Sequence, residues 1–561
     1  MSLYENIKER VTNQLEEAAQ TAKAAGELSF IELPSYVLEE PRERQHGDLA
    51  TNLAMVLAKQ AKRSPRDIAT TLIKYLDTTG TWIESSEIAG AGFINFRLNP
   101  LWLTDVINEV IKAGERYGQV DIGKGQKIQV EFVSANPTGL LHMGNARGAA
   151  LGDSLASLLT MAGYEVSREF YINDTGNQIH NFALSLESRY LQLLGQDAPF
   201  PEGGYHGEDL IDTVKGLITK VGDKYLSVEP GLRREFLVRY ALEEKMQDIR
   251  ETLEDFGVKY DVWFNEQSLH DSGAVRSTLE ELQKKGYIYE KEGALWLKST
   301  LFGDEKDEVV IRSNGTPTYF AADIAYHRNK FERGFTRVIN IWGADHHGHV
   351  ARLKGAMSAF GYDKDNLQVI LMQLVRLIRN GEVVKMSKRS GQYITLRELM
   401  DEVGKDAARF FFSLRDPDSA VDFDLDLAKA QSSDNPVYYV QYAHARMCSI
   451  LRQAEELGDA GKKPPSDEEL KLLNSTEERD LLKKMADLPS EVSIAARLME
   501  PHRLARYVLD LAGLFHTFYN SQRVLVDDEG LRRARLSLVG AVKQIISNVL
   551  GILGVSAPER M

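Results

Sequence analysis

Cysteine is almost absent from this sequence. Cys448 is the one cysteine among 561 residues, which excludes a disulfide scaffold and a zinc site built from thiolates. Long apolar runs are absent too: even the most apolar segment, 536–555, is interrupted by charged and amide residues, so a transmembrane helix is not expected. The first 20 residues lack the apolar core of a secretory signal. Together these features predict a protein of a reducing compartment, the cytoplasm.

Basic residues are outnumbered by acidic ones, 68 to 82, which gives a formal net charge of −14. Since like charges repel, this balance argues against a protein that coats nucleic acid without specificity, although a local basic surface remains compatible with it. The imbalance is confined to the first 435 residues, because residues 436–561 hold 17 basic and 17 acidic side chains. A neutral segment at the end of an acidic chain is compatible with an anionic partner there.

The length of 561 residues is enough for three or four domains, and the composition, 43% hydrophobic and 27% charged, is that of a globular protein. Residues 1–30 and 48–63 have helical periodicity, and residues 92–98 alternate apolar and polar side chains as a half-buried strand does. These pieces predict a small α+β domain over residues 1–100. A linking helix is expected over residues 101–113.

A strand, a loop, a helix and a second strand come next, which is the opening of a nucleotide-binding α/β fold. The helix is expected to start near Gly144 and to end at Gly163. A mostly helical stretch, about 185–290, is interpreted as an insertion. From residue 435 to the end the pattern is helical, apart from one loop. The strands expected to form one sheet cover residues 127–135, 165–173, 337–344 and 368–377.

The sequence thus predicts an α/β protein with three parts. A Rossmann-like catalytic domain with a helical insertion covers residues 101–434. The small α+β domain precedes it, and an α-helical bundle over residues 435–561 follows it.

The first motif with chemical meaning reads ANPTGLLHMGN, from Ala135 to Asn145. It follows a strand and opens a helix, whose first N–H groups and positive dipole end suit phosphate. Gly144 allows the backbone to approach a nucleotide closely, and His142 can donate a hydrogen bond to a phosphate oxygen. The alternative is a surface histidine before an ordinary helix, and for this motif alone that alternative is favoured.

The second motif reads VVKMSKRSGQYITL, from Val383 to Leu396. Lys385 and Lys388 lie three residues apart beside Ser387, in a short basic loop that can reach a polyphosphate. The alternative is a solvated basic loop. The two motifs occur about 240 residues apart in one chain, which favours a shared phosphate site over two unrelated loops.

These motifs resemble the HIGH and KMSKS motifs of class I aminoacyl-tRNA synthetases, and the chain is similar to the bacterial type of the arginyl-tRNA synthetases over essentially its whole length. It departs from the family at Asn145, where histidine is usual, and at Arg389, where KMSKS ends in serine. The similarity extends to these segments: QHGDLATNLA, GFINFRL, VEFVSANPTG, REFYINDTGNQI, TYFAADIAYH, WGADHHGHV and YYVQYAHAR.

The resemblance implies site residues. The catalytic group is His142, Asn145, Lys385 and Lys388. The ATP-binding residues are Ala135, Asn136, Pro137, Thr138, Gly139, Leu140, Leu141, His142, Met143, Gly144, Asn145, Met386, Ser387 and Lys388. The arginine-binding residues are Glu131, Ser134, Asn136, Tyr319, Asp323, Asp345 and His346. The tRNA-binding residues are Tyr438, Tyr442, Arg446 and Met561.

The residue chemistry agrees with arginine as the substrate, because a guanidinium needs oxygen acceptors in a plane. Tyr319 and Asp323 are four apart and share a face if they lie on a helix. Without the resemblance, an ordinary exposed helix pair is the favoured interpretation of these two. Tyr438, Tyr442 and Arg446 likewise share a face if helical, and could stack on loop bases, although at least one tyrosine of the segment is expected in the core.

Three histidines, His346, His347 and His349, suggest a metal site, but the spacing is not that of HExxH, so no bound metal is expected. The implied cofactor is ATP with Mg²⁺. The implied reaction joins arginine to AMP and then to the terminal adenosine of its tRNA, in a cytoplasmic protein that is expected to be a monomer. The alternatives are another class I synthetase, a small-molecule nucleotidylyltransferase, and an inactive tRNA-binding relative.

Overall fold

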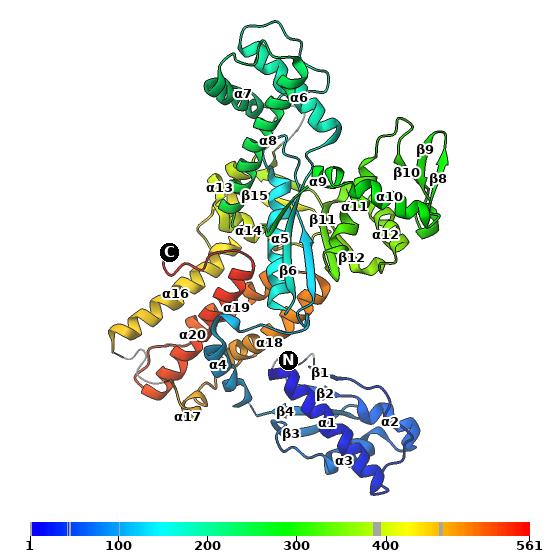
Figure 1. The fold of residues 1–561 in the computed structure, drawn as a ribbon. Coiled ribbons are helices and arrows are strands. Elements are labelled where there is room, and N and C mark those ends of the chain that lie inside the picture. The colour runs from blue at the N-terminus through cyan, green and yellow to red at the C-terminus, as the bar shows by residue number, and fades with distance from the viewer. Residues whose placement is uncertain (1–2, 42, 44–45, 100, 385–393, 459–463) are drawn as a thin grey trace.

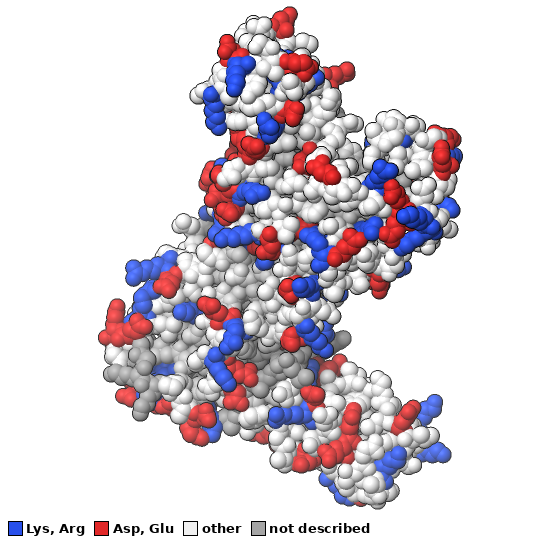
Figure 2. Space-filling view, viewed as in Figure 1, with Lys and Arg blue, Asp and Glu red and all other residues white. Residues whose placement is uncertain are grey.

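The computed structural model describes residues 3–41, 43, 46–99, 101–384, 394–458 and 464–561. The chain is elongated, with the N-terminal domain at one end, the catalytic domain and the helical bundle in the middle, and a helical insertion at the other end (Figure 1). On the face seen in Figure 2, basic and acidic side chains are interspersed over all these parts. None of the described helices is long and apolar enough to span a bilayer.

The N-terminal domain packs three helices on an antiparallel sheet with strand order β1-β2-β4-β3. The expected helix over residues 48–63 is shorter, because Leu49–Thr51 pairs with the strand that contains Phe96 and so becomes β2. The linker helix α4 (Leu101–Ala113) lies where the sequence predicts it. The elements of the domain are α1 (Leu3–Ala24), β1 (Leu38–Glu39), β2 (Leu49–Thr51), α2 (Leu53–Ala61), α3 (Pro65–Tyr75), β3 (Ile83–Ala89) and β4 (Phe93–Leu98).

The catalytic domain is built on a five-stranded parallel sheet with order β12-β11-β5-β6-β7. The strand order reverses at β5, which has β6 on one side and β11 on the other, and ligands of such sheets bind where this happens. The predicted Rossmann-like class is confirmed. The strands are β5 (Lys127–Glu131), β6 (Glu165–Ile172), β7 (Val262–Asn265), β11 (Arg337–Gly343) and β12 (Leu367–Met372).

Helices cover both faces of this sheet. On one face, α5 (Met143–Met161) packs on Ile128, Val130 and Ile339. On the other, α11 (Tyr319–Glu332) and α12 (His347–Phe360) pack on Val338 in a second core. Because both faces are covered, apolar residues predominate in β7, β11 and β12, as is usual in parallel sheets, whereas β5 and β6 also carry polar residues such as Glu131 and Glu169.

The expected insertion at about 185–290 has different bounds. The helical part consists of α6 (Gly176–Leu193), α7 (Glu208–Val221) and α8 (Pro230–Asp255), which enclose a small core of their own. The chain then returns to the main sheet as β7 (Val262–Asn265), so part of the last third of the expected insertion is an edge strand. The elements that follow are α9 (Gln267–Asp271), α10 (Ala274–Lys284), β8 (Ile288–Lys291), β9 (Ala294–Leu297) and β10 (Glu308–Ile311).

The segment 368–377, expected as one strand, is divided between two sheets. Its first part is β12, and its end belongs to β13, which pairs with β14 and β15 in a separate sheet. The chain turns out of the main sheet between Met372 and Val375. The elements here are β13 (Val375–Arg379), β14 (Glu382–Val383), α13 (Leu396–Val403), α14 (Lys405–Ser413), β15 (Val421–Asp424) and α15 (Leu425–Lys429).

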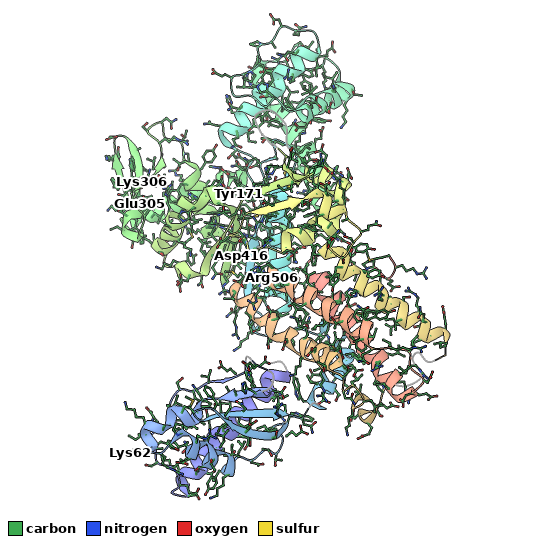
Figure 3. All side chains as sticks on the ribbon, turned by 180° about the vertical axis from the view of Figure 1, so that it is seen from behind. Lys62, Tyr171, Glu305, Lys306, Asp416 and Arg506 are labelled. Carbon is green, nitrogen blue, oxygen red and sulfur yellow. The ribbon has the colours of Figure 1, made fainter. Side chains whose placement is uncertain are left out.

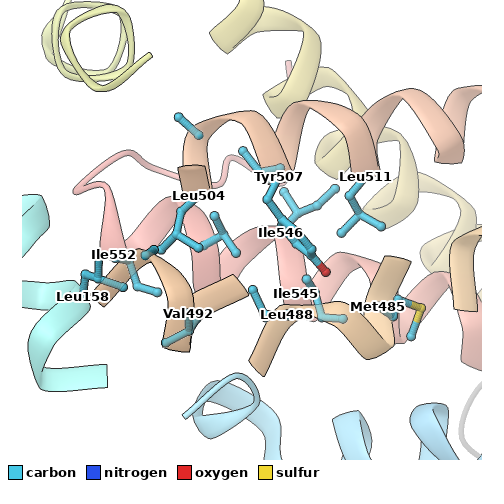
Figure 4. Close-up of a cluster of buried hydrophobic side chains, with 14 of the residues drawn as sticks. Leu158, Met485, Leu488, Val492, Leu504, Tyr507, Leu511, Ile545, Ile546 and Ile552 are labelled. Carbon is cyan, nitrogen blue, oxygen red and sulfur yellow. The ribbon is translucent and has the colours of Figure 1, made fainter. Parts of the chain in front are cut away.

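The C-terminal part is a helical bundle, as predicted, and its core continues into the catalytic domain. Leu158 of α5 joins the apolar cluster of the bundle, beside Ile552 (Figure 4). The buried Arg409 strengthens the junction, since its guanidinium donates to the Leu553 carbonyl at 2.9 Å and to Asp153 at 2.6 Å. The helices are α16 (Pro436–Glu456), α17 (Asp467–Leu470), α18 (Thr476–Leu498), α19 (His502–Ser521) and α20 (Glu529–Ile552).

Candidate active site

The N-terminus of α5 carries the HMGN motif in a reciprocal cap. His142 is the N-cap residue, and its Nδ1 accepts a hydrogen bond from the Gly144 N–H at 3.1 Å. The side-chain oxygen of Asn145 accepts one from the His142 N–H at 3.0 Å. A neutral ring whose Nδ1 is an acceptor carries its proton on Nε2, which is the tautomer that can donate to a phosphate oxygen. A side chain at Gly144 would press on this ring, since a Cβ there would lie 3.0 Å from it.

The loop between β5 and α5 begins in an unusual conformation. Val133 and Ser134 have φ values of 69° and 40°, in the left-handed region that side chains disfavour. The Ser134 hydroxyl compensates by donating to a Glu131 oxygen at 2.9 Å and accepting from the Tyr171 N–H at 3.1 Å. Asn136 is exposed beyond this turn and donates to Gln178 at 2.5 Å. The loop from Ala135 to Leu141 therefore leaves the sheet from a fixed root.

Helix α11 presents the residues predicted to bind the guanidinium. Thr318 caps it, and Tyr319 and Asp323 lie in its first turns with the predicted spacing of four. Tyr319 is 44% exposed, and its hydroxyl lies close to Gly176 at the start of α6. Asp323 Oδ2 lies 2.9 Å from His349 Nε2. The two predicted residues thus stand on one helix, with the aspartate oriented by a histidine from α12.

The segment directly after β11 carries Asp345 and the histidines His346 and His347. Asp345 and His346 lie in a 3₁₀ turn, Ala344–His346, with side chains that are 84% and 59% exposed. His347 begins α12. Within the described part of the chain, no three His, Cys, Asp or Glu side chains are placed to hold a metal ion.

Two residues of the site escaped the sequence analysis. Tyr171, at the centre of the catalytic domain (Figure 3), is buried at the end of β6. Glu266 follows β7 directly, is 3% exposed, and accepts a hydrogen bond from the Thr175 hydroxyl at 2.8 Å. Burial, together with the negative charges of Glu266 and Asp323, strongly raises the pKa of Tyr171. The Glu266 N–H donates at 3.0 Å to the carbonyl of Ile172, the residue after Tyr171. The Tyr171 ring packs on that of Tyr326, three residues after Asp323, with 4.3 Å between the ring centroids. Glu266 was overlooked because β7 was not predicted as a strand, although carboxyl ends of neighbouring parallel strands meet at one edge.

The second motif is only partly described. Lys385, Met386, Ser387 and Lys388 lie outside the described residues. The chain that follows them is bonded to the first motif, because the Leu396 N–H donates to the Leu141 carbonyl at 2.8 Å and Thr395 forms a β-bridge with His142. The segments that carry the two motifs therefore meet, as the sequence predicts.

The bundle presents a row of aromatic rings on α16. The rings of Tyr438 and Tyr442 are nearly parallel, with centroids 6.0 Å apart. The Arg446 guanidinium lies 4.6 Å from the ring centroids of both Tyr442 and Tyr519. All of these side chains are half-buried or more exposed. The row combines flat apolar faces with one fixed cation, a combination that single-stranded bases stack on.

The chain end runs along the same helix. His444 lies with its Nδ1 2.9 Å from the Pro558 carbonyl, and Gln441 donates to the Ser556 carbonyl at 2.9 Å. Met561, predicted to contact tRNA, is 55% exposed. The last residues are thus fixed beside α16 by its side chains.

Comparisons with known proteins agree with this architecture. Residues 5–98 match the family model of the arginyl tRNA synthetase N terminal domain. Residues 106–203 and 222–429 match the catalytic domain of class I (R) tRNA synthetases, and residues 440–561 match the DALR anticodon binding domain.

Individual proteins are also similar over long stretches. The chain is 78% identical to the arginine–tRNA ligase of Desulfitobacterium hafniense, with 100% of both chains aligned. A putative arginyl-tRNA synthetase from Campylobacter jejuni superposes with a TM-score of 0.76 at 36% identity, covering 83% of this chain and 100% of that one. The arginyl-tRNA synthetase of Thermus thermophilus shares the fold, with a TM-score of 0.72 at 24% identity, covering 98% of this chain and 100% of that one.

Proposed function

Because the chain belongs to the arginine–tRNA ligase family of class I synthetases, we propose that the pocket around Tyr171 holds arginine and that the N-terminus of α5 holds ATP. The enzyme activates arginine with ATP and transfers it to tRNA. The observation that carries the site assignment is the approach of Glu266 and helix α11 to Tyr171: Glu266 bonds to the adjacent residue Ile172, and Tyr326 of α11 packs on the Tyr171 ring. Every residue role below is part of the proposal.

The guanidinium is bound between acidic and hydroxyl groups. Its planar fork of N–H donors needs several acceptors, which Asp323, Glu266 and the Tyr319 hydroxyl can provide. His349 bonds one oxygen of Asp323, so the other oxygen is available to the substrate. A lysine substrate would bring a compact ammonium that cannot bond to all three, so the pocket favours arginine.

The ammonium end of arginine is held near the root of the β5–α5 loop. Glu131 supplies negative charge and accepts from Ser134, and Asn136 follows in the same loop, bonded to Gln178. Asp345 and His346 line the pocket from the end of β11. With both cationic ends of arginine held, its carboxylate is directed toward the α5 N-terminus and the α-phosphate of ATP.

The ATP site uses positioning and charge in place of a covalent nucleophile. His142 Nε2–H donates to the phosphates where negative charge develops, and the N–H groups of the first turn of α5 add to this. The amide of Asn145 contributes a further donor. By resemblance, Lys385 and Lys388 stabilise the same negative charge on the phosphates. Mg²⁺ accompanies ATP and is held by phosphates and water.

The protein is proposed to act in the cytoplasm as a monomer, with the bundle on the anticodon of the tRNA. We expect activation to require bound tRNA, as it generally does in the enzymes that this chain resembles. Light scattering of the purified chain tests the monomer. Arginine-dependent ATP–pyrophosphate exchange, measured with and without tRNA, tests the order of binding, and strong exchange without tRNA would contradict it.

The site assignment is tested with the same exchange assay in the presence of tRNA. His142→Ala is expected to lower the exchange rate by about 10²-fold, as the loss of one transition-state donor does. Glu266→Gln is expected to raise the KM for arginine at least about tenfold, since one charge-assisted bond is lost, and to leave the KM for ATP unchanged. Wild-type kinetics in both variants would remove these residues from the site.

A further inference from the structure

We propose that Lys330, a buried residue outside the arginine pocket, positions Glu131 and the backbone at Asp323 and thereby couples the two ends of the pocket. This inference rests on the proposed role of Glu131 in holding the substrate ammonium. It assigns a function to a side chain that does not touch the substrate, since Lys330 is fully buried between α11 and the sheet.

The ammonium group of Lys330 has a defined partner in each direction. It donates to Glu131 Oε2 at 2.5 Å and to the side-chain oxygen of Asn340 at 3.0 Å. The ring of Tyr326 is its third neighbour, with the centroid 4.3 Å from Nζ. A lysine has three N–H donors, and a buried cation is tolerated only when it is bonded in this way.

From Asn340 the chain of hydrogen bonds continues to Asp323. The Asn340 amide donates to His327 Nε2 at 2.6 Å, and His327 Nδ1 lies 2.8 Å from the Asp323 carbonyl oxygen. Burial and the nearby Lys330 charge hold the pKa of His327 well below its usual value, so the ring is neutral. The His327 ring therefore accepts at Nε2 and donates at Nδ1, and every residue in this series of hydrogen bonds has a partner.

In the other direction from Lys330, the hydrogen bonds lead through Glu131 to the start of the loop between β5 and α5. Glu131 Oε1 accepts from the Ser134 hydroxyl at 2.9 Å, and Ser134 is, with Val133, one of the two residues of this loop in the left-handed conformation. Lys330 thus fixes one oxygen of Glu131 and Ser134 fixes the other, and each oxygen keeps a further lone pair that can accept from an ammonium. Four side chains, those of Glu131, Lys330, Asn340 and His327, connect the loop before HMGN to the helix that carries the guanidinium-binding residues.

The sequence alone does not reveal this role of Lys330, but the geometry of helix α11 explains it. His327 and Lys330 lie four and seven residues after Asp323, so they continue its face of the helix toward the sheet. Asn340 on β11 is the neighbour of Glu131 in the parallel register. The sheet and the helix therefore bring the four side chains together.

A matched control exists at the C-cap of the same helix, directly after its last residue. Arg333 binds Glu169 through two hydrogen bonds of 2.6 and 2.8 Å, and Glu169 is the neighbour of Glu131 on β6. Arg333→Met removes an ion pair to a buried carboxylate on the same face of the sheet, but Arg333 has no bond to Glu131. A purely structural role for Lys330 would make the two variants behave alike.

The experiment compares Lys330→Met with Arg333→Met in tRNA-dependent exchange, with thermal unfolding of each. We expect Lys330→Met to raise the KM for arginine by about tenfold or more, because Glu131 loses a charged partner, while kcat and the KM for ATP change less than about threefold. Arg333→Met is expected to lower the unfolding temperature without changing the KM for arginine. An equal KM for arginine in both variants would overturn the proposal.

Two further variants keep the outcome decisive. If Lys330→Met does not fold, Lys330→Gln keeps donors for Glu131 and Asn340 without the charge, and it is expected to raise the KM for arginine by a smaller factor; an unchanged KM would again overturn the proposal. Glu131→Gln separates the two hypotheses. If it leaves the KM for arginine unchanged, the proposed ammonium site itself is wrong, whereas an effect of Glu131→Gln without one of Lys330→Met refutes only the coupling.

Discussion

His349 holds Asp323: its Nε2 lies 2.9 Å from Asp323 Oδ2, which joins α12 to α11 across the mouth of the proposed guanidinium site. The resemblance assigns arginine binding to Asp345 and His346, and not to His349. Those two side chains are largely exposed, whereas His349 is bonded to the predicted ligand.

The first prediction follows from this bond. Asp323→Asn should raise the KM for arginine at least about tenfold, because a charge-assisted partner of the guanidinium is lost. His349→Gln should raise it less, since the carboxylate remains and loses only its orientation. The measurement is exchange at varied arginine with tRNA present. A larger effect of His349→Gln than of Asp323→Asn would reverse the assignment of ligand and support.

Asn145 allows a second prediction, about the departure from HIGH. Its side-chain oxygen accepts a hydrogen bond from the His142 N–H, so the amide NH₂ is the group that can donate a hydrogen bond to phosphate. Asn145→Asp keeps the capping acceptor but places a negative charge near ATP, so it should lower the exchange rate at least about tenfold with an unchanged unfolding temperature. Asn145→Ala should lower both. Full activity of Asn145→Asp would limit this residue to helix capping.

Much of the fold and part of the site could be predicted from the sequence. The linker helix has a strong helical periodicity, α5 is bounded by the first motif and Gly163, and both lie where expected. The errors in the predicted elements arose where pairing with a distant strand overrides the local sequence pattern. Leu49–Thr51 and β7 are short segments that form strands because each pairs with a neighbouring strand of its sheet. Glu266 and Lys330 could not be found for the same reason, since their roles depend on partners about 100 and 200 residues away.

The third prediction concerns pH and the chain end. Burial, aided by the charge of Lys543, lowers the pKa of His444, although the bond to the Pro558 carbonyl opposes this. The unfolded chain therefore binds a proton near its ordinary pKa of about 6.5 that the folded chain does not bind. The stability due to His444 is complete above that pH and is lost as the pH falls below it.

The measurement for His444 is thermal unfolding between about pH 8 and pH 5.5, a range that spans the ordinary histidine pKa. Since other histidines also titrate, the comparison is with His444→Gln, which should lose less stability on acidification than the wild type does. Parallel curves for the two proteins would exclude His444 as a source of the pH dependence.

The last prediction concerns the aromatic row on α16. If Tyr438, Tyr442 and Arg446 bind anticodon bases, Tyr442→Ala should weaken tRNA binding by about tenfold or more, because stacking of one base on an aromatic ring is worth about 1–3 kcal/mol. Tyr442→Phe is the matched control: it keeps the ring and loses only the hydroxyl that accepts from Arg446, so most of the affinity should remain. Exchange kinetics at saturating tRNA should be close to wild type in both variants, because the row lies on the bundle and not in the proposed arginine pocket. The measurement is the affinity for cognate tRNA and for tRNA with a changed anticodon. Loss of discrimination between the two in Tyr442→Ala supports the assignment, whereas unchanged affinity and discrimination would mean that these rings only pack the bundle.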